Sequence, residues 1–264
     1  AAGLPIKGQV APRAVGVLMG LQGSRNPFPD HPSYRAIAGK PLAERLAVMR
    51  DPTFRARLLG ERKADSGDPI ARRLEHFDMI FPLGDPPNYA PRAEDSLAAE
   101  AARLGRSPQD VAYDRLIAND GRDFLFTPIA NYRAHTLEVC REMLQSPHTL
   151  VGLGDGGAHV GFICDAGFST FLLSYWGRDA GADRLDLPGL VRRQTRDTAR
   201  AVGLSDRGTI EPGMKADLNL IDFDRLDAGL PYMASDLPAG GKRLLQRATG
   251  YVATVVSGAI TYRD

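Results

Sequence analysis

The chain has 264 residues, 43% of them hydrophobic, so it can bury a sizeable core as one large domain or two smaller ones. Its 33 basic and 32 acidic residues give a formal net charge of +1, which excludes a global attraction to nucleic acid or to an anionic membrane. The sequence contains no apolar run of about 18 residues, and its first residues lack the pattern of a signal peptide. Two cysteines in unrelated contexts indicate a reducing compartment. We therefore expect a cytoplasmic protein without nucleic-acid or membrane partners.

The first half of the chain is predicted to contain one strand followed by helices. Residues 5–21 alternate in hydrophobicity, which predicts a strand and then an irregular loop. Farther on, helix starts are marked by Asp51 and Ser107, each followed by proline, and one helix end is marked by Gly105. The helical patterns cover residues 41–50, 51–62, 96–105 and 107–118. We interpret residues 26–118 as a largely helical insertion or cap.

The next part of the chain alternates between strand and helix patterns. Residues 124–132 are apolar enough for a strand or a buried loop, and residues 135–145 have the spacing of an amphipathic helix. Residues 149–154 then read as a buried strand, and residues 185–204 as a helix opened by proline and closed by glycine. This order is typical of an α/β fold.

The last sixty residues have a different character. Two short strands are predicted around the turn at Pro212 and Gly213, and a hairpin is predicted around Ser257 and Gly258. Residues 206–264 are therefore expected to form a small all-β module.

The stretch TLVGLGDGGAHVG, residues 149–161, carries the strongest chemical signal and allows three interpretations. Gly152, Gly154 and Gly157 have the spacing of a dinucleotide-binding loop, but Asp155 among the loop amides would repel a pyrophosphate. Alternatively, Asp155 is a catalytic carboxylate at the C-terminal end of a strand, where barrel enzymes place their reacting groups. The third interpretation is that Asp155 caps the following turn. The pattern alone does not separate the last two.

Four stretches together resemble a known family. They are DTARAVGLSDRGTIEPGMKADLNLIDF (197–223), GQVAPR (8–13), NPFPDHPSYRAIAG (26–39) and GLGDGGAHVGFICDA (152–166). The chain resembles, over essentially its whole length, the C-terminal portion of amidohydrolase-superfamily enzymes of the D-aminoacylase branch, the N-acyl-D-amino-acid deacylases.

The resemblance implies a fold with two parts. Residues 1–205 would form the late strands of a metal-dependent (β/α)8 hydrolase barrel, a TIM barrel, with the helical insertion at about 26–118 covering the active-site mouth. Residues 206–264 would form part of a β-sandwich. The fold class implied is α/β.

The resemblance also assigns roles to individual residues. Asp155 matches the aspartate at the end of the eighth barrel strand, which in the family touches the metal and takes a proton from the attacking hydroxide. Residues 9–13 match the seventh strand, and Asp217 matches a structural position. Zinc, the implied metal, lowers the pKa of a bound water to about 7, so that a nearby carboxylate can receive its proton.

The chain departs from the family in its histidines. The family begins its metal site with a His-x-His pair, which this sequence lacks; its histidines are His31, His76, His135, His148 and His159. We infer a C-terminal portion that supplies Asp155 but lacks most metal ligands, so that the isolated chain is inactive and binds little or no zinc. A missing N-terminal half or a partner chain would complete it, and copies of the chain could form a homo-oligomer.

The substrate implied is a small N-acyl amino acid or a related amide. The branch commonly follows its Asp-Gly with Pro-Arg, whose guanidinium holds the substrate carboxylate, and this sequence has no such arginine there. We predict His159 and Arg13 as substitutes, although His159 could merely cap the loop and Arg13 could pair with a carboxylate of the cap. A hypothesis of another class is a non-catalytic assembly or ligand-binding module completed by a partner chain.

Overall fold

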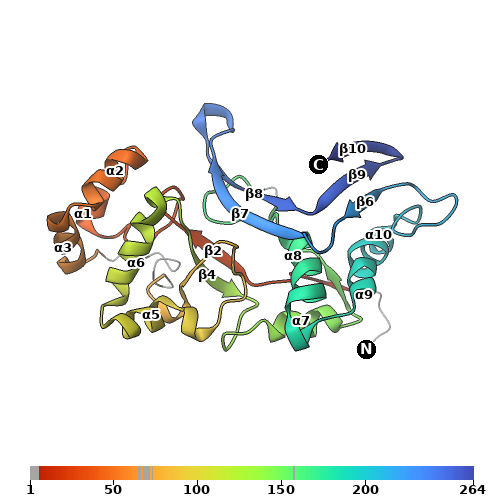
Figure 1. Cartoon of the computed structure of the whole chain (residues 1–264), viewed down its shortest axis with the longest axis horizontal. Coiled ribbons are helices and arrows are strands. Elements are labelled where there is room, and N and C mark those ends of the chain that lie inside the picture. The colour runs from red at the N-terminus through yellow and green to blue at the C-terminus, as the bar shows by residue number, and fades with distance from the viewer. Residues whose placement is uncertain (1–5, 65–66, 68–71, 73, 157) are drawn as a thin grey trace.

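The computed structural model describes residues 6–64, 67, 72, 74–156 and 158–264. The protein is a mixed α/β structure: the insertion helices lie at one end, and the C-terminal strands run along one side (Figure 1). Among the helices of these described residues, none has the length and hydrophobicity needed to cross a membrane.

A short parallel strand pair underlies the candidate site. Strand β1 (Gly8–Val10) pairs with β5 (Thr149–Val151), and the amide of Gly152 extends the pairing by donating to the carbonyl of Val10 at 3.0 Å. Because the strands are parallel, the segments that follow them leave from the same edge. Three sequence predictions need correction here: β1 ends at Val10, not at Arg13; β5 ends at Val151, not at Gly154; and β5 is half-buried, not buried.

A second, antiparallel sheet divides the interior into two cores. Its order is β2 (Val15–Met19), β4 (Leu125–Ala130) and β3 (Phe81–Pro82). Alternate side chains of a strand point to opposite faces, so Val17 and Met19 join the core beneath the insertion helices, while Leu18 joins the core on the other face. The insertion is thus fixed to the sheet through β3.

The insertion contains the predicted helices. Asp51 caps its helix by accepting from the amide of Thr53, Ser107 caps the last by accepting from the amide of Asp110, and Gly105 ends its helix at φ 63°. The helices are α1 (Pro32–Arg35), α2 (Leu42–Met49), α3 (Pro52–Gly60), α5 (Leu97–Leu104) and α6 (Pro108–Ile117). Local start and stop signals explain why the sequence prediction was confirmed here.

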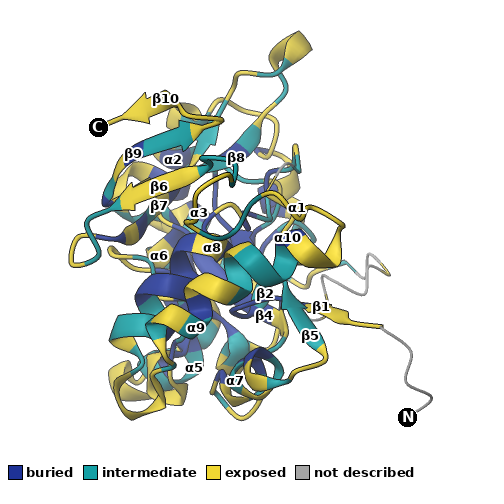
Figure 2. Cartoon of the chain, turned by 90° about the vertical axis from the view of Figure 1, so that its right-hand side faces the viewer, coloured by how far each residue is buried: buried dark blue, intermediate teal, exposed yellow. Residues whose placement is uncertain are grey.

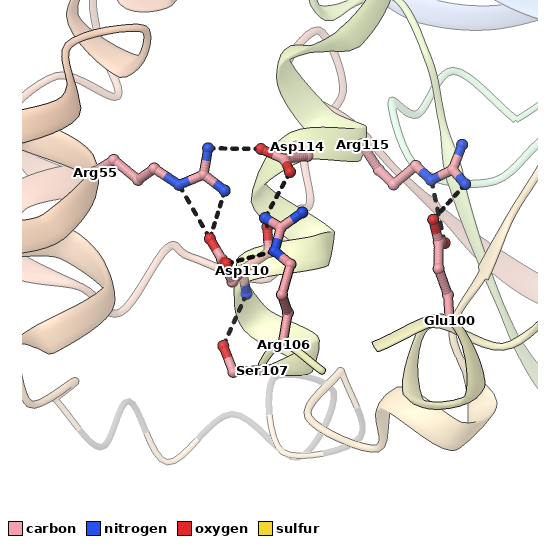
Figure 3. A network of polar contacts seen from close by, with 7 residues as sticks. All are labelled: Arg55, Glu100, Arg106, Ser107, Asp110, Asp114 and Arg115. Atoms are coloured by element: carbon pink, nitrogen blue, oxygen red, sulfur yellow. Dashed lines mark hydrogen bonds and ion pairs between the residues drawn. The ribbon is translucent and has the colours of Figure 1, made fainter. Parts of the chain in front are cut away.

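An ion-pair network joins α3 to α6 (Figure 3). The Arg55 guanidinium bonds to both Asp110 and Asp114, and Arg106 bonds to the same two carboxylates. The hydrogen bond from Arg106, followed by those from Arg55, holds the pKa of Asp110 below its ordinary value. A network of this kind stabilises more than isolated surface pairs because each charge has several partners.

Three of the helices after β4 pack on the core that contains Leu18: α7 (Glu138–Gln145), α8 (Phe168–Ser174) and α9 (Leu187–Arg192). The helical chain from Phe168 passes through a π-helical turn at Tyr175–Asp179, and the indole Nε1 of Trp176 there donates to the carbonyl of Pro12 at 2.6 Å. Trp176 is 1% exposed. Helix α10 (Thr198–Ala201) follows, and a second π-helical turn joins α9 to it.

The C-terminal region consists mainly of strands, with a 3₁₀ turn at Pro238–Gly240, and its strands differ from the prediction. One sheet has the order β10 (Ala259–Arg263), β9 (Tyr251–Val256) and β6 (Leu218–Ile221), and β7 (Asp227–Ala234) forms a separate hairpin with β8 (Arg243–Thr249). The predicted turn at Ser257 and Gly258 is present, with φ of 53° and 82°.

The first strand predicted for this region is absent. Residues 207–209 are bends and residues 210–211 have no regular structure; the amide of Lys215 donates to the carbonyl of Asp206 across this stretch. The hairpin of β7 and β8 was not predicted. Figure 2 shows β6 and β10 largely exposed on the outside of this region.

Candidate functional site

The two segments that leave the edge of the β1–β5 pair carry the predicted site residues Arg13 and Asp155. Arg13 follows the end of β1 by three residues, and Asp155 follows the end of β5 by four. The side chain of Asp165 lies between them: its Oδ2 accepts from the amide of Asp155 at 3.2 Å, and its Oδ1 is 3.8 Å from Nη2 of Arg13. Parallel pairing of residues 141 positions apart in sequence, such as Gly8 with Thr149, therefore brings the two predicted residues to one edge of the sheet.

Asp155 is exposed at this edge. The turn after it is closed by its main-chain carbonyl, which accepts from the amide of Ala158 at 2.9 Å. The amide that an Asp155 side chain would cap belongs to Gly157, which lies outside the described residues, so the catalytic interpretation of Asp155 stays a prediction.

The glycines beside Asp155 allow the chain to pack closely on the turn at residues 165–168. A Cβ atom at Gly154 would lie 3.1 Å from the ring of Phe168, and one at Gly156 would lie 3.5 Å from Cα of Ala166. A dinucleotide-binding loop needs a helix directly after its glycines. The described residues 158–164 contain no helix, so this interpretation loses its structural basis; Gly157 lies outside the described residues.

Arg13 is buried, with 2% of its surface exposed. Its Nη2 donates to the carbonyl of Cys164 at 2.8 Å and its Nη1 to that of Ala14 at 3.0 Å, and its guanidinium carbon lies 3.7 Å from the centre of the Tyr89 ring and 4.4 Å from that of Phe168. Burial lowers the pKa of Arg13. The sequence suggested contact with a substrate or with a carboxylate of the insertion; the structure places its charge against Asp165, while the insertion supplies the Tyr89 ring.

Asp165 was missed by the sequence interpretation. It is 4% exposed, and burial raises its pKa, while the hydrogen bond from the Asp155 amide and the charge of Arg13 act in the opposite direction. The residue stands in the stretch ICDA that contributes to the family resemblance, but nothing in its local pattern indicates a buried carboxylate.

His159 is exposed and lies toward the hairpin of β7 and β8. The carbonyl of the next residue, Val160, accepts from the amide of Leu244 in β8 at 3.0 Å. The pKa of Asp236, beside the hairpin end, is lowered by its hydrogen bonds from Arg243 and, to a smaller extent, by the charge of His159. His159 is thus an exposed side chain whose charge reaches Asp236, and its role in substrate binding stays a prediction.

Backbone hydrogen bonds hold the loop beyond His159 on three sides. The carbonyls of Val160, Gly161 and Phe162 accept from the amides of Leu244, Ser24 and Leu18, at 3.0, 2.9 and 2.8 Å. These donors belong to β8, to the segment after β2, and to β2 itself. The site loop is therefore a packed part of the structure.

Comparison with known proteins identifies the family. The sequence profile described as "Amidohydrolase family" matches residues 2–262. The chain belongs to the amidohydrolase family. A comparison with curated proteins found no match.

Solved structures with partial similarity include two enzymes. One is D-aminoacylase, described as defining a novel subset of amidohydrolases, at 21% identity and a TM-score of 0.36, covering 70% of this chain and 35% of its own. Another is N-acyl-D-glutamate deacylase from Bordetella bronchiseptica, complexed with zinc and a phosphonate inhibitor, at 23% identity and a TM-score of 0.36, covering 72% and 36%. This amidohydrolase chain thus spans about a third of the length of the structures it matches.

The donor set around Asp155 does not by itself fit a zinc ion. Among the described residues, no three His, Cys, Asp or Glu side chains gather closely enough to hold a metal. The nearest acid, Asp165, is buried and already engaged by Arg13 and the amide of Asp155. Structural and catalytic zinc sites use three or four protein ligands. Asp155 could contribute one ligand of such a site.

Proposed function

We propose that this amidohydrolase chain is part of a metal-dependent enzyme that hydrolyses linear amides, similar to the N-acyl-D-amino-acid deacylases, with Asp155 as its proton-transfer residue. The observation that supports the proposal is the exposed Asp155, four residues beyond the C-terminal end of a parallel strand pair, with its main-chain amide donating to Asp165. Enzymes with parallel strands and helices place catalytic groups at this end of the sheet.

In the proposed reaction, the oxygen of a water molecule bonds to the carbonyl carbon of the amide. The Asp155 carboxylate accepts one proton from that water and delivers it to the nitrogen as the C–N bond breaks, which releases a carboxylic acid and an amine. Its exposed side chain is accessible for this task. The proposed substrate is a small N-acyl amino acid or a related amide.

His159 is the proposed contact for the polar end of the substrate, because it is exposed four residues after Asp155. Arg13 could bind a substrate carboxylate only by exchanging its present partners, since its guanidinium is enclosed. Its enclosed position favours an internal contact with Asp165 over contact with a substrate.

A metal is part of the proposal, with ligands supplied by a missing N-terminal half or by a partner chain. Two relatives are described with a metal: a binuclear metal center in D-aminoacylase, and zinc in the N-acyl-D-glutamate deacylase. We propose zinc for the complete enzyme. Metal analysis after dialysis is expected to find far less than one zinc per 264-residue chain, and stoichiometric zinc would contradict the missing ligands.

The experiment that tests the role of Asp155 is Asp155→Asn in the complete enzyme. Loss of a proton-transfer group is expected to lower turnover of an N-acyl amino acid by about 10²- to 10⁴-fold. Asp206→Asn is a matched control, because Asp206 is an exposed acid that pairs with its neighbour Arg207. Near-normal turnover of Asp155→Asn, with the fold intact by circular dichroism, would refute the role.

A second candidate function is assembly with another chain, favoured by apolar side chains on the outside of the C-terminal region. Leu220 in β6 is 62% exposed and Ile260 in β10 is 54% exposed. Apolar side chains gathered on a surface often mark an interface. Size-exclusion chromatography with light scattering tests this candidate: a complex or homo-oligomer supports it, and a stable monomer at micromolar concentration contradicts it.

A further inference from the structure

The carboxylate of Asp165 is buried at a cost that only its partners can offset. A buried charge loses its hydration, so such a group is retained where hydrogen bonds and an opposite charge replace the water. Asp165 is 4% exposed, and its two oxygens face different partners: Arg13 on one side and the amide of Asp155 on the other. The buried carboxylate therefore joins a fixed cation to the main chain of the proposed catalytic residue.

Arg13 is a rigid support for this carboxylate. Its guanidinium lies between the rings of Tyr89 and Phe168, and two carbonyl oxygens accept from it. Planar contacts and hydrogen bonds of this kind hold an arginine in one orientation. Tyr89 is itself held, because its hydroxyl accepts from Nε2 of Gln246 at 3.1 Å.

The main chain that carries Asp155 needs such a support. Leu153 is a non-glycine residue at φ 66°, and it is followed by glycines on both sides of Asp155. Glycine gives the chain more conformational freedom than any other residue. Within the described residues, the amides of Leu153 and Gly154 make no hydrogen bond to another segment. The next amide that does so after Gly152 is that of Asp155.

We propose that Asp165 is a positioning residue that fixes the main chain of Asp155, and that Arg13 holds Asp165 in place for this purpose. The proposal rests on the proposed function for its catalytic consequence, but the positioning itself can be measured without turnover.

The first measurement is amide hydrogen exchange by NMR on the 264-residue chain. In the unmodified chain the Asp155 amide is expected to exchange slower than an unprotected amide. In Asp165→Ala its exchange is expected to accelerate about five- to tenfold, because one hydrogen bond is lost. Asp165→Asn keeps an oxygen acceptor and is expected to restore most of the protection. The Gly152 amide, bonded to Val10, is the internal reference.

Ser174→Ala is the control variant. Ser174 is 3% exposed and donates to the carbonyl of Thr170, so the variant removes a buried hydrogen bond without touching the site loop. The Asp155 amide is expected to keep its exchange rate there. An Asp155 amide that exchanges at the unprotected rate in the unmodified chain overturns the proposal, even if Asp165→Ala fails to fold. Unchanged exchange in folded Asp165→Ala overturns it as well.

The second measurement is steady-state kinetics of the complete enzyme. Misplacing a catalytic group by about 1 Å can lower the rate about a hundredfold. We therefore expect Asp165→Ala to lower kcat by about that factor with little change in KM, and Asp165→Asn to recover most of it. If Asp155→Asn abolishes turnover while Asp165→Ala keeps its kcat, only the positioning role fails. If Asp155→Asn remains active, the proposed function fails and the exchange result still decides the positioning.

Discussion

Replacement of Arg13 by methionine tests whether burial or distance determines the strength of an ion pair in this protein. Methionine fills part of the space between the Tyr89 and Phe168 rings but leaves Asp165 as a buried carboxylate without its cation. Breaking a buried pair from one side typically costs 3–5 kcal/mol, about half of the 5–15 kcal/mol that stabilises an ordinary domain. We expect the free energy of unfolding to fall by about 3–5 kcal/mol at pH 7.

Urea denaturation followed by far-UV circular dichroism measures this change, and Arg35→Met is its matched control. The Arg35 side chain is 52% exposed and lies 3.0 Å from Asp30, closer than the 3.8 Å between Arg13 and Asp165. Distance alone would make the exposed pair the stronger one, whereas solvent screening predicts a cost of about 0–1 kcal/mol for its loss. If Arg13→Met lowers the free energy of unfolding no more than Arg35→Met does, the claim that burial strengthens the Arg13–Asp165 pair is refuted.

Two further substitutions and one thiol reactivity measurement test other parts of the structure. Gly154→Ala brings a Cβ atom to 3.1 Å from the ring below and is expected to cost about 1 kcal/mol or more by urea denaturation, whereas Gly8→Ala, which meets no atom within 4 Å, is expected to cost less. Asp110→Asn removes half of a four-residue network and is expected to cost about 1–2 kcal/mol at pH 7. Because the folded pKa of Asp110 is lowered, this difference should be present above the unfolded pKa of about 4 and disappear as the pH falls through the folded value; a pH-independent difference would contradict the ionic origin. Burial raises the pKa of Cys140 to about 12 and also raises that of Cys164, so both thiols should react with Ellman's reagent far more slowly in buffer than in urea, and equal rates would contradict their burial.

The helices of the insertion could be predicted because their signals are local. Asp51 and Ser107 cap helices with side chains only two or three residues from the amides they bind, and Gly105 ends a helix through its own φ. Such contacts can be predicted from a few neighbouring residues of the sequence. They do not depend on how the rest of the chain is arranged.

The strands of the C-terminal region were harder to predict because their partners are distant in sequence. β7 contains Gly229 and Pro231, which normally argue against a strand, and its pairing with β8 shifts register between Ala228 and Pro231 to accommodate them. A short strand was predicted before the turn at Pro212, but residues 207–209 are bends and residues 210–211 have no regular structure. Ile210 there is 87% exposed, so its hydrophobicity was a misleading signal.

The candidate site was predicted in part. A strand ending in Gly-Asp-Gly indicated Asp155, and the family resemblance gave it a role. Arg13 was also singled out, but its contact with the carbonyl of Cys164 spans 151 residues, and a buried partner such as Asp165 cannot be recognised before the chain is folded. Sequence patterns find residues that begin or end local structure more readily than residues that meet across the core.

The three consecutive carbonyls of Val160, Gly161 and Phe162 have a consequence for how the protein can be divided. They bond to β8, to the segment after β2, and to β2, so a short loop joins regions that the sequence separates. Cutting the chain at residue 205 would separate β8 from this loop. Deleting residues 26–118 would remove β3 from the sheet of β2, β4 and β3, which lies beside the loop. We expect that neither residues 1–205 nor the chain without residues 26–118 folds as an autonomous unit. This makes the chain a poor source of modules for transplantation into other proteins.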